Sequence, residues 1–220
     1  MLGNNRRARC LAGVCPDEPP VCPVCRRLVL PAAPPAWALP HAVAQRSIPV
    51  ENANYGRDFK LHDPDGSVKR LADFRGAVLV LFFGYTSCPD ACPTALLKLH
   101  EALALLPEAA RAKVQVRFVT LDPERDSPAV LKDYLGMFGE PFHALTGTRA
   151  EIDAAAKEFR IYARRSTLPG TDFYVIDHST NLFLFDPQGK LRLVAPHAIS
   201  AENLAKDLQS LLDAPHKAGD

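Results

Sequence analysis

Apolar and polar residues in the middle of the chain predict a strand, a helix and a second strand, in that order. Residues 77–83 are apolar without alternation, which is typical of a strand buried on both faces of a sheet. Residues 94–106 carry leucines at helical spacing and predict an amphipathic helix. Residues 114–121 alternate between apolar and polar side chains, so we expect a further strand there.

Turn sequences predict two β-hairpins, one before and one after this central part. The Asp-Pro-Asp-Gly turn at 63–66 combines a proline that presets φ with a glycine that accepts positive φ. Short strands at 59–61 and 68–70 flank it. A similar Asp-Pro-Gln-Gly turn at 186–189 lies between expected strands at 181–185 and 190–194.

Capping residues predict three more helices. Ser127 with Pro128 opens a helix to about residue 138. Thr148 and Glu151 form a capping box for a helix that ends near residue 159, and Ser200 caps a last helix through residue 212. This order of elements predicts an α/β protein with a thioredoxin-like fold: a central mixed sheet flanked by helices, with an extra N-terminal β-hairpin.

Residues 1–54 differ in composition from the rest of the chain. The first 50 residues hold nine of the twenty prolines and four of the six cysteines, without a regular apolar period. A basic pair at 26–27, an apolar run at 28–39 and an Ala-Val-Ala sequence at 42–44 resemble a secretory signal, although prolines interrupt the run. We therefore expect an irregular leader or signal or anchor remnant over 1–54, one domain over 55–213 and a short tail over 214–220.

The four N-terminal cysteines allow two interpretations. Cys22 and Cys25 form a Cys-x-x-Cys pair, and with Cys10 and Cys15 they could bind zinc. Their short spacing among arginines and prolines favours an unstructured leader, or a start codon assigned too far upstream. Over the whole chain the formal net charge is +1, with no basic stripe, so nucleic-acid binding is not expected.

The most informative segment contains two cysteines directly after the predicted buried strand. Cys88 and Cys92 lie where a loop leads into a helix, and a helix N-terminus favours thiolate over thiol. Thiolates attack disulfides and bind soft metal ions such as Cu(I). The three intervening residues leave a redox dithiol and a metal dithiolate about equally favoured, with a structural disulfide third and zinc also open.

A copper site with two sulfurs usually adds an imidazole. Among seven histidines, His178 precedes the predicted strand at 181–185. In a thioredoxin-like sheet the loop that enters this strand faces the dithiol loop. Position therefore makes His178 the best candidate for a third ligand.

The chain resembles the Sco/SenC family of copper chaperones for cytochrome oxidase assembly, over about residues 55–212. The resemblance rests on the segments Tyr55–Phe59, Phe83–Thr86, Cys88–Thr94, Leu121–Pro128, Asp177–Ser179 and Phe185–Lys190. It implies one Cu(I) or Cu(II) ion per chain, bound by Cys88, Cys92 and His178. It also implies copper delivery to the binuclear site of cytochrome c oxidase subunit II, or prior reduction of that site's cysteines.

The same resemblance implies a periplasmic location at the bacterial inner membrane, and relatives usually carry a membrane or lipid anchor. The alternative function is a thiol-disulfide oxidoreductase that uses Cys88 and Cys92 on exported or oxidase proteins. A peroxiredoxin-like peroxidase is disfavoured because the Pro-x-x-x-Thr-x-x-Cys pattern is absent. Turn and capping chemistry explains the segment 122–126, while a role near the metal is the competing interpretation.

Overall fold

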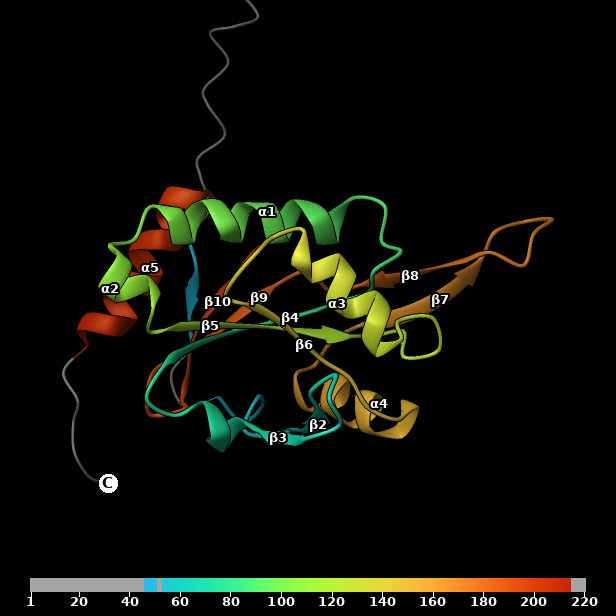
Figure 1. Cartoon of the computed structure of the whole chain (residues 1–220), viewed down its shortest axis with the longest axis horizontal. Coiled ribbons are helices and arrows are strands. Elements are labelled where there is room, and N and C mark those ends of the chain that lie inside the picture. Colours follow the sequence, from blue (N-terminus) through green and yellow to red (C-terminus); the bar gives the residue numbers. More distant parts are fainter. Residues whose placement is uncertain (1–45, 51–52, 215–220) are drawn as a thin grey trace, which may run out of the picture. The chain divides into compact units, whose positions relative to one another are not determined.

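The computed structural model describes residues 46–50 and 53–214, which contain a six-stranded mixed sheet (Figure 1). β4 and β5 are parallel, as are β5 and β6, whereas β9 is antiparallel to both β4 and β10. The strands across the sheet are β1 (Ile48–Pro49), β10 (Leu191–Ala195), β9 (Leu182–Phe185), β4 (Val78–Gly84), β5 (Val114–Thr120) and β6 (Phe142–Leu145).

Helices cover one face of this sheet, and the N-terminal hairpin together with one more helix covers the other (Figure 1). One face packs against α1 (Ala91–Ala104), α3 (Pro128–Gly136) and α5 (Ala201–Asp213). The other face packs against α4 (Arg149–Glu158), the β2–β3 hairpin (Lys60–His62 and Val68–Arg70) and the 3-10 helix η2 (Leu71–Phe74). The short helix α2 (Glu108–Arg111) follows α1.

Burial on both sides explains why β4 is apolar at every position. Alternate side chains point to opposite faces of a strand. Val80 and Phe82 contribute to the core under α1, whereas Leu81 and Phe83 contribute to the core over α4. The main chain of β4 is paired along both edges as well, with β5 on one side and β9 on the other.

The predicted fold class is confirmed, including the mixed sheet and the extra hairpin. The first helix begins at Ala91, three residues before the predicted start. Several short elements were not predicted: β1, β6, α2 and a third hairpin formed by β7 (Ala163–Thr167) and β8 (Tyr174–His178). β6 has four residues, and β7 has no buried side chain, so neither shows a clear apolar period.

β1 lies before residue 55, and the expected domain limits stay a prediction. The expectations for the segment 1–45, including Cys10, Cys15, Cys22 and Cys25, fall outside the described residues, as do those for the end of the tail. Within 46–50 and 53–214, no helix has the length and apolar character needed to cross a membrane.

The β7–β8 hairpin forms a separate two-stranded sheet that extends beyond the end of the central sheet (Figure 1). Its strands are antiparallel, and Ala163 is the register partner of His178. The backbone N–H of Ser179 donates to the carbonyl of Tyr162 at 3.0 Å and extends the pairing at the base of the hairpin.

Truncating Phe159 should test the core beneath α4. This side chain is 1% exposed, and its ring lies 5.2 Å from that of Phe83 and 5.3 Å from that of Phe183. Phe159→Ala should lower the free energy of unfolding by about 3–5 kcal/mol in urea titrations, because the cavity adds to the lost apolar burial. Met137→Ala, at a side chain 72% exposed, should change it by less than about 0.5 kcal/mol. Equal effects would contradict this packing.

Candidate dithiol and metal site

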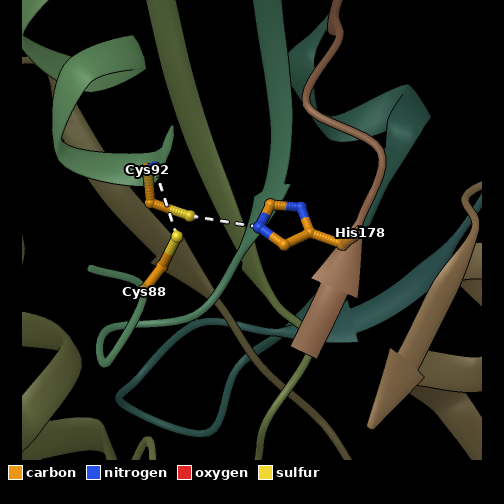
Figure 2. A group of neighbouring side chains, drawn as sticks. All are labelled: Cys88, Cys92 and His178. Atoms are coloured by element: carbon orange, nitrogen blue, oxygen red, sulfur yellow. Dashed lines mark hydrogen bonds between the residues drawn. The ribbon is translucent and has the colours of Figure 1, made fainter. Parts of the chain in front are cut away.

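Three side chains from separate elements meet at the carboxyl end of β4 (Figure 2). Cys88 lies in the loop after β4, Cys92 in the first turn of α1, and His178 at the last position of β8. One sulfur from each cysteine and one ring nitrogen all lie within 4.8 Å of one another. The structure thus brings the three predicted ligands together, and their role as ligands stays a prediction.

Hydrogen bonds orient both the sulfurs and the imidazole (Figure 2). The Cys92 backbone N–H donates to Cys88 Sγ at 3.4 Å, and Cys92 Sγ lies 3.5 Å from His178 Nε2. His178 Nδ1 lies 2.9 Å from the Ser179 carbonyl, which can only accept, so Nδ1 carries a proton. In the neutral ring, Nε2 therefore keeps a lone pair directed at the sulfurs, the form in which histidine binds metals.

The two cysteines differ in exposure and in acidity. Cys92 is buried, whereas Cys88 is half-buried. The hydrogen bond from Cys92 lowers the pKa of Cys88 from 9.0 to about 3, with help from His178 and against the effect of burial. The same hydrogen bond raises the pKa of Cys92, as do burial and the negative charge of Cys88. Cys88 is therefore the more acidic sulfur of the pair.

This arrangement supports two kinds of chemistry. A half-buried thiolate in front of a buried thiol can attack a disulfide. Two sulfurs and an imidazole nitrogen can instead bind one soft metal ion. Both uses need the same loop in the same place, so the residues that hold the loop matter for either.

A buried carboxylate anchors the dithiol loop from behind. Asp126 is 1% exposed, and its Oδ2 accepts hydrogen bonds from the Thr86 N–H at 3.1 Å and the Thr120 hydroxyl at 2.6 Å. The Thr86 hydroxyl donates to the other oxygen at 2.5 Å. Burial raises the pKa of Asp126, although these hydrogen bonds oppose the shift. Sequence reasoning missed this anchor because capping accounts only for the neighbouring Ser127, which accepts from the Val130 N–H.

The aromatic residues near the loop are core residues. Phe82 and Phe83 are fully buried and Tyr85 is 2% exposed. Tyr85 also touches the site, because its ring meets that of His178 edge-on with centroids 5.7 Å apart. His178 itself was expected in a loop before the strand at 181–185. It lies instead at the end of β8, on a hairpin that was not expected from the sequence.

Gly84 allows the strand and the first turn of α1 to approach each other. A Cβ atom at this position would lie 2.6 Å from Cys92 Sγ and 2.8 Å from Phe118 Cε2, far inside normal contact. Gly84→Ala should therefore cost about 1–3 kcal/mol of unfolding free energy in urea titrations. Gly136→Ala, near the end of α3 with open space around it, should be neutral or slightly stabilising. Wild-type stability in Gly84→Ala would refute the close approach.

Asp126 should make stability depend on pH in a defined direction. Because its pKa is raised on folding, its contribution is fully present below the unfolded pKa and is lost as pH rises through the folded value. The asparagine side chain in Asp126→Asn does not titrate. The difference in unfolding free energy between the wild type and the variant should thus become smaller as pH rises above about 4. Urea unfolding of both chains across that range checks it, and a pH-independent difference would contradict the burial of a titrating carboxyl.

A family model and individual relatives both match this chain to the same protein family. The SCO1/SenC family model matches residues 49–213. An SCO2-like protein of Rickettsia felis is 37% identical over 147 residues, covering 66% of this chain and 71% of the relative. The mitochondrial SCO2 homologue of Bos taurus is 35% identical over 167 residues, covering 75% of this chain and 63% of the relative.

Solved structures agree with the sequence comparison. Bradyrhizobium japonicum ScoI with copper bound superposes with a TM-score of 0.65 and 33% identity, covering 71% of this chain and 99% of that one. Yeast Sco1 with copper bound gives a TM-score of 0.67 and 32% identity, covering 76% and 92%. The family-model match over residues 49–213, together with these similarities, establishes that the chain belongs to the SCO1/SenC family.

Proposed function

We propose that this chain is a copper metallochaperone that assists assembly of the binuclear copper site of cytochrome c oxidase subunit II. It binds one copper ion, as Cu(I) or Cu(II), through Cys88, Cys92 and His178. The observation that carries the proposal is the convergence of the two sulfurs and His178 Nε2 within 4.8 Å. Two similar structures, from yeast and Bradyrhizobium japonicum, are described with copper bound.

The donor set suits copper for chemical reasons. Thiolate sulfur and imidazole nitrogen are ligands that copper prefers, whereas magnesium and calcium prefer oxygen. Closed zinc sites generally use four protein ligands, and the group found within the described residues has three. The hydrogen bond from Nδ1 to the Ser179 carbonyl holds the imidazole in the tautomer that leaves Nε2 free.

The protonation of the metal-free site determines which proton is displaced when copper binds. Cys88 is the thiolate and Cys92 the thiol of the pair. Ligands must be deprotonated to bind a metal ion, so loading would displace the proton from Cys92. The half-buried Cys88 is the more accessible sulfur, and a receiving protein would reach the cargo from its side.

A thiol-disulfide oxidoreductase remains the second candidate, favoured by the acidity of Cys88 and the burial of Cys92. The Cys88 thiolate would attack a partner disulfide, whose second sulfur leaves as a thiolate. Cys92, after losing its proton, would attack Cys88 Sγ and release the first partner sulfur. The partner gains two electrons, and Cys88 and Cys92 become a disulfide. This chemistry could also prepare oxidase cysteines for copper.

The same proposal puts the domain on the periplasmic side of the bacterial inner membrane, where an oxidase copper site would be reached. The signal-like pattern at 26–44 supports export, and residues 1–54 would then serve as leader or tether. The domain proper would span the expected 55–213 together with β1 (Ile48–Pro49), which pairs with β10 at the edge of the sheet.

Copper titration of the wild type and two site variants tests the proposal. The wild type should bind one Cu(I) per chain, and Cys88→Ser/Cys92→Ser should bind none tightly. His178→Ala should bind at least about tenfold more weakly, because a ligand is lost. His143→Ala, at a half-exposed histidine outside the group of three, should match the wild type.

The same variants separate the two candidate functions. Disulfide exchange uses the two cysteines, and the hydrogen bond from Cys92 is the main cause of the acidity of Cys88, so His178→Ala should still reduce a model disulfide peptide at close to the wild-type rate. A wild type that exchanges disulfides but takes up no copper would overturn the chaperone proposal in favour of the oxidoreductase.

A further inference from the structure

The hairpin that carries His178 is attached to the rest of the domain chiefly through side chains. Within the described residues, β7 and β8 pair with each other and share no ladder with the six-stranded sheet. No main-chain ladder therefore fixes the distance from His178 to the sulfurs. The distance is fixed instead by the short link from His178 to β9 and by contacts between β8 and the loops at the carboxyl ends of β4 and β5.

The strongest of these contacts surround Tyr174. Its hydroxyl donates to Asp122 Oδ1 at 2.8 Å, and the other oxygen of that carboxylate accepts from Arg125 Nε. The same guanidinium donates through Nη1 to the Tyr174 carbonyl at 3.0 Å. Asp122 and Arg125, both in the loop after β5, thus hold the side chain and the main chain of Tyr174 at once.

The ring of Tyr174 is also stacked. The guanidinium of Arg125 lies 3.6 Å from the ring centroid, and that of Arg165 lies 3.3 Å from it. Arg165 in turn pairs with Glu124 at 2.9 Å. Asp122 is 1% exposed, and a buried carboxylate that loses a hydrogen-bond or ion-pair partner is strongly destabilised.

Strand periodicity transmits this placement to the histidine. Tyr174, Ile176 and His178 are two residues apart along β8, so their side chains share one face. The backbone N–H of Ile176 donates to the Tyr85 hydroxyl at 3.2 Å, and the Tyr85 ring meets that of His178. Tyr85 lies three residues before Cys88. The face of β8 that carries Tyr174 and His178 therefore contacts the dithiol loop through Tyr85.

We propose that Asp122, Arg125 and Tyr174 form a positioning clamp that sets the distance between His178 and the two cysteines. The proposal rests on the proposed function, since it treats His178 as a copper ligand. The clamp residues do not touch the metal. They act by holding β8, which gives the 122–125 segment a role beyond its turn geometry.

A double-mutant cycle tests the clamp. Tyr174→Phe and Arg125→Lys are made in the wild type and in His178→Ala, and Cu(I) affinity is measured for each chain. In the wild type each should lower affinity by about tenfold, the size of effect typical of groups that orient a ligand. In His178→Ala they should have no effect, because the residue they position is gone. Equal losses in both backgrounds would overturn the proposal.

Arg192→Lys is the matched control. Arg192 pairs through Nε with Asp186 at 2.7 Å, and Asp186 is 2% exposed, so the variant also disturbs an arginine bound to a buried carboxylate. It lies on the β9–β10 hairpin and should leave copper affinity unchanged. A loss equal to that of Arg125→Lys would show that general destabilisation explains the result.

A measurement on the metal-free chain separates this proposal from the proposed function. The NMR signals of the His178 ring should shift in Tyr174→Phe and Arg125→Lys and stay unchanged in Arg192→Lys. If the wild type binds no copper, the chaperone proposal fails, and these shifts still decide whether the clamp positions His178. Unshifted His178 signals in both clamp variants would overturn it.

Discussion

The two-sided burial of β4 is the constraint on which the rest of the structure depends. Its side chains fill both cores, and its main chain is paired along both edges. A strand held in this way has little freedom to shift. Its carboxyl end therefore delivers the dithiol loop to one place, and Gly84 lets the first turn of α1 close over that end with Cys92 in van der Waals range.

The acidity of the dithiol follows from this placement. The first turn of α1 provides the Cys92 N–H to Cys88 Sγ, and the buried thiol of Cys92 provides a second hydrogen bond. Asp126 holds the loop from the opposite side through Thr86. A thiolate is thus kept ready in a half-buried position, as both metal binding and disulfide exchange require. The imidazole of His178 is the feature that favours the metal.

Much of the fold could be predicted from local pattern alone. The run at 77–83 indicated the buried strand, and the Thr148 capping box indicated α4, because both depend on residues close in sequence. β7 could not be found in this way, since its Ala-Arg-Arg-Ser-Thr segment has no buried side chain. It forms a strand because it pairs with β8, a contact between residues up to fifteen positions apart.

The same distinction between local sequence patterns and contacts distant in sequence applies to the candidate site. Cys88 and Cys92 stood out because a strand and a helix border them, and His178 was selected by its position before β9. The interactions of Asp126, Arg125 and Tyr174 were not foreseen, because each joins segments that are distant in sequence. Polar side chains in a loop look alike in sequence whether they face solvent or become buried on folding.

X-ray absorption spectroscopy of the Cu(I)-loaded chain tests the central claim most directly, since it identifies the atoms bound to the metal. The account predicts two sulfur scatterers and one histidine nitrogen, with the nitrogen signal lost in His178→Ala. A spectrum with sulfur ligands alone, unchanged in that variant, would contradict the proposed site and leave His178 outside the copper coordination sphere.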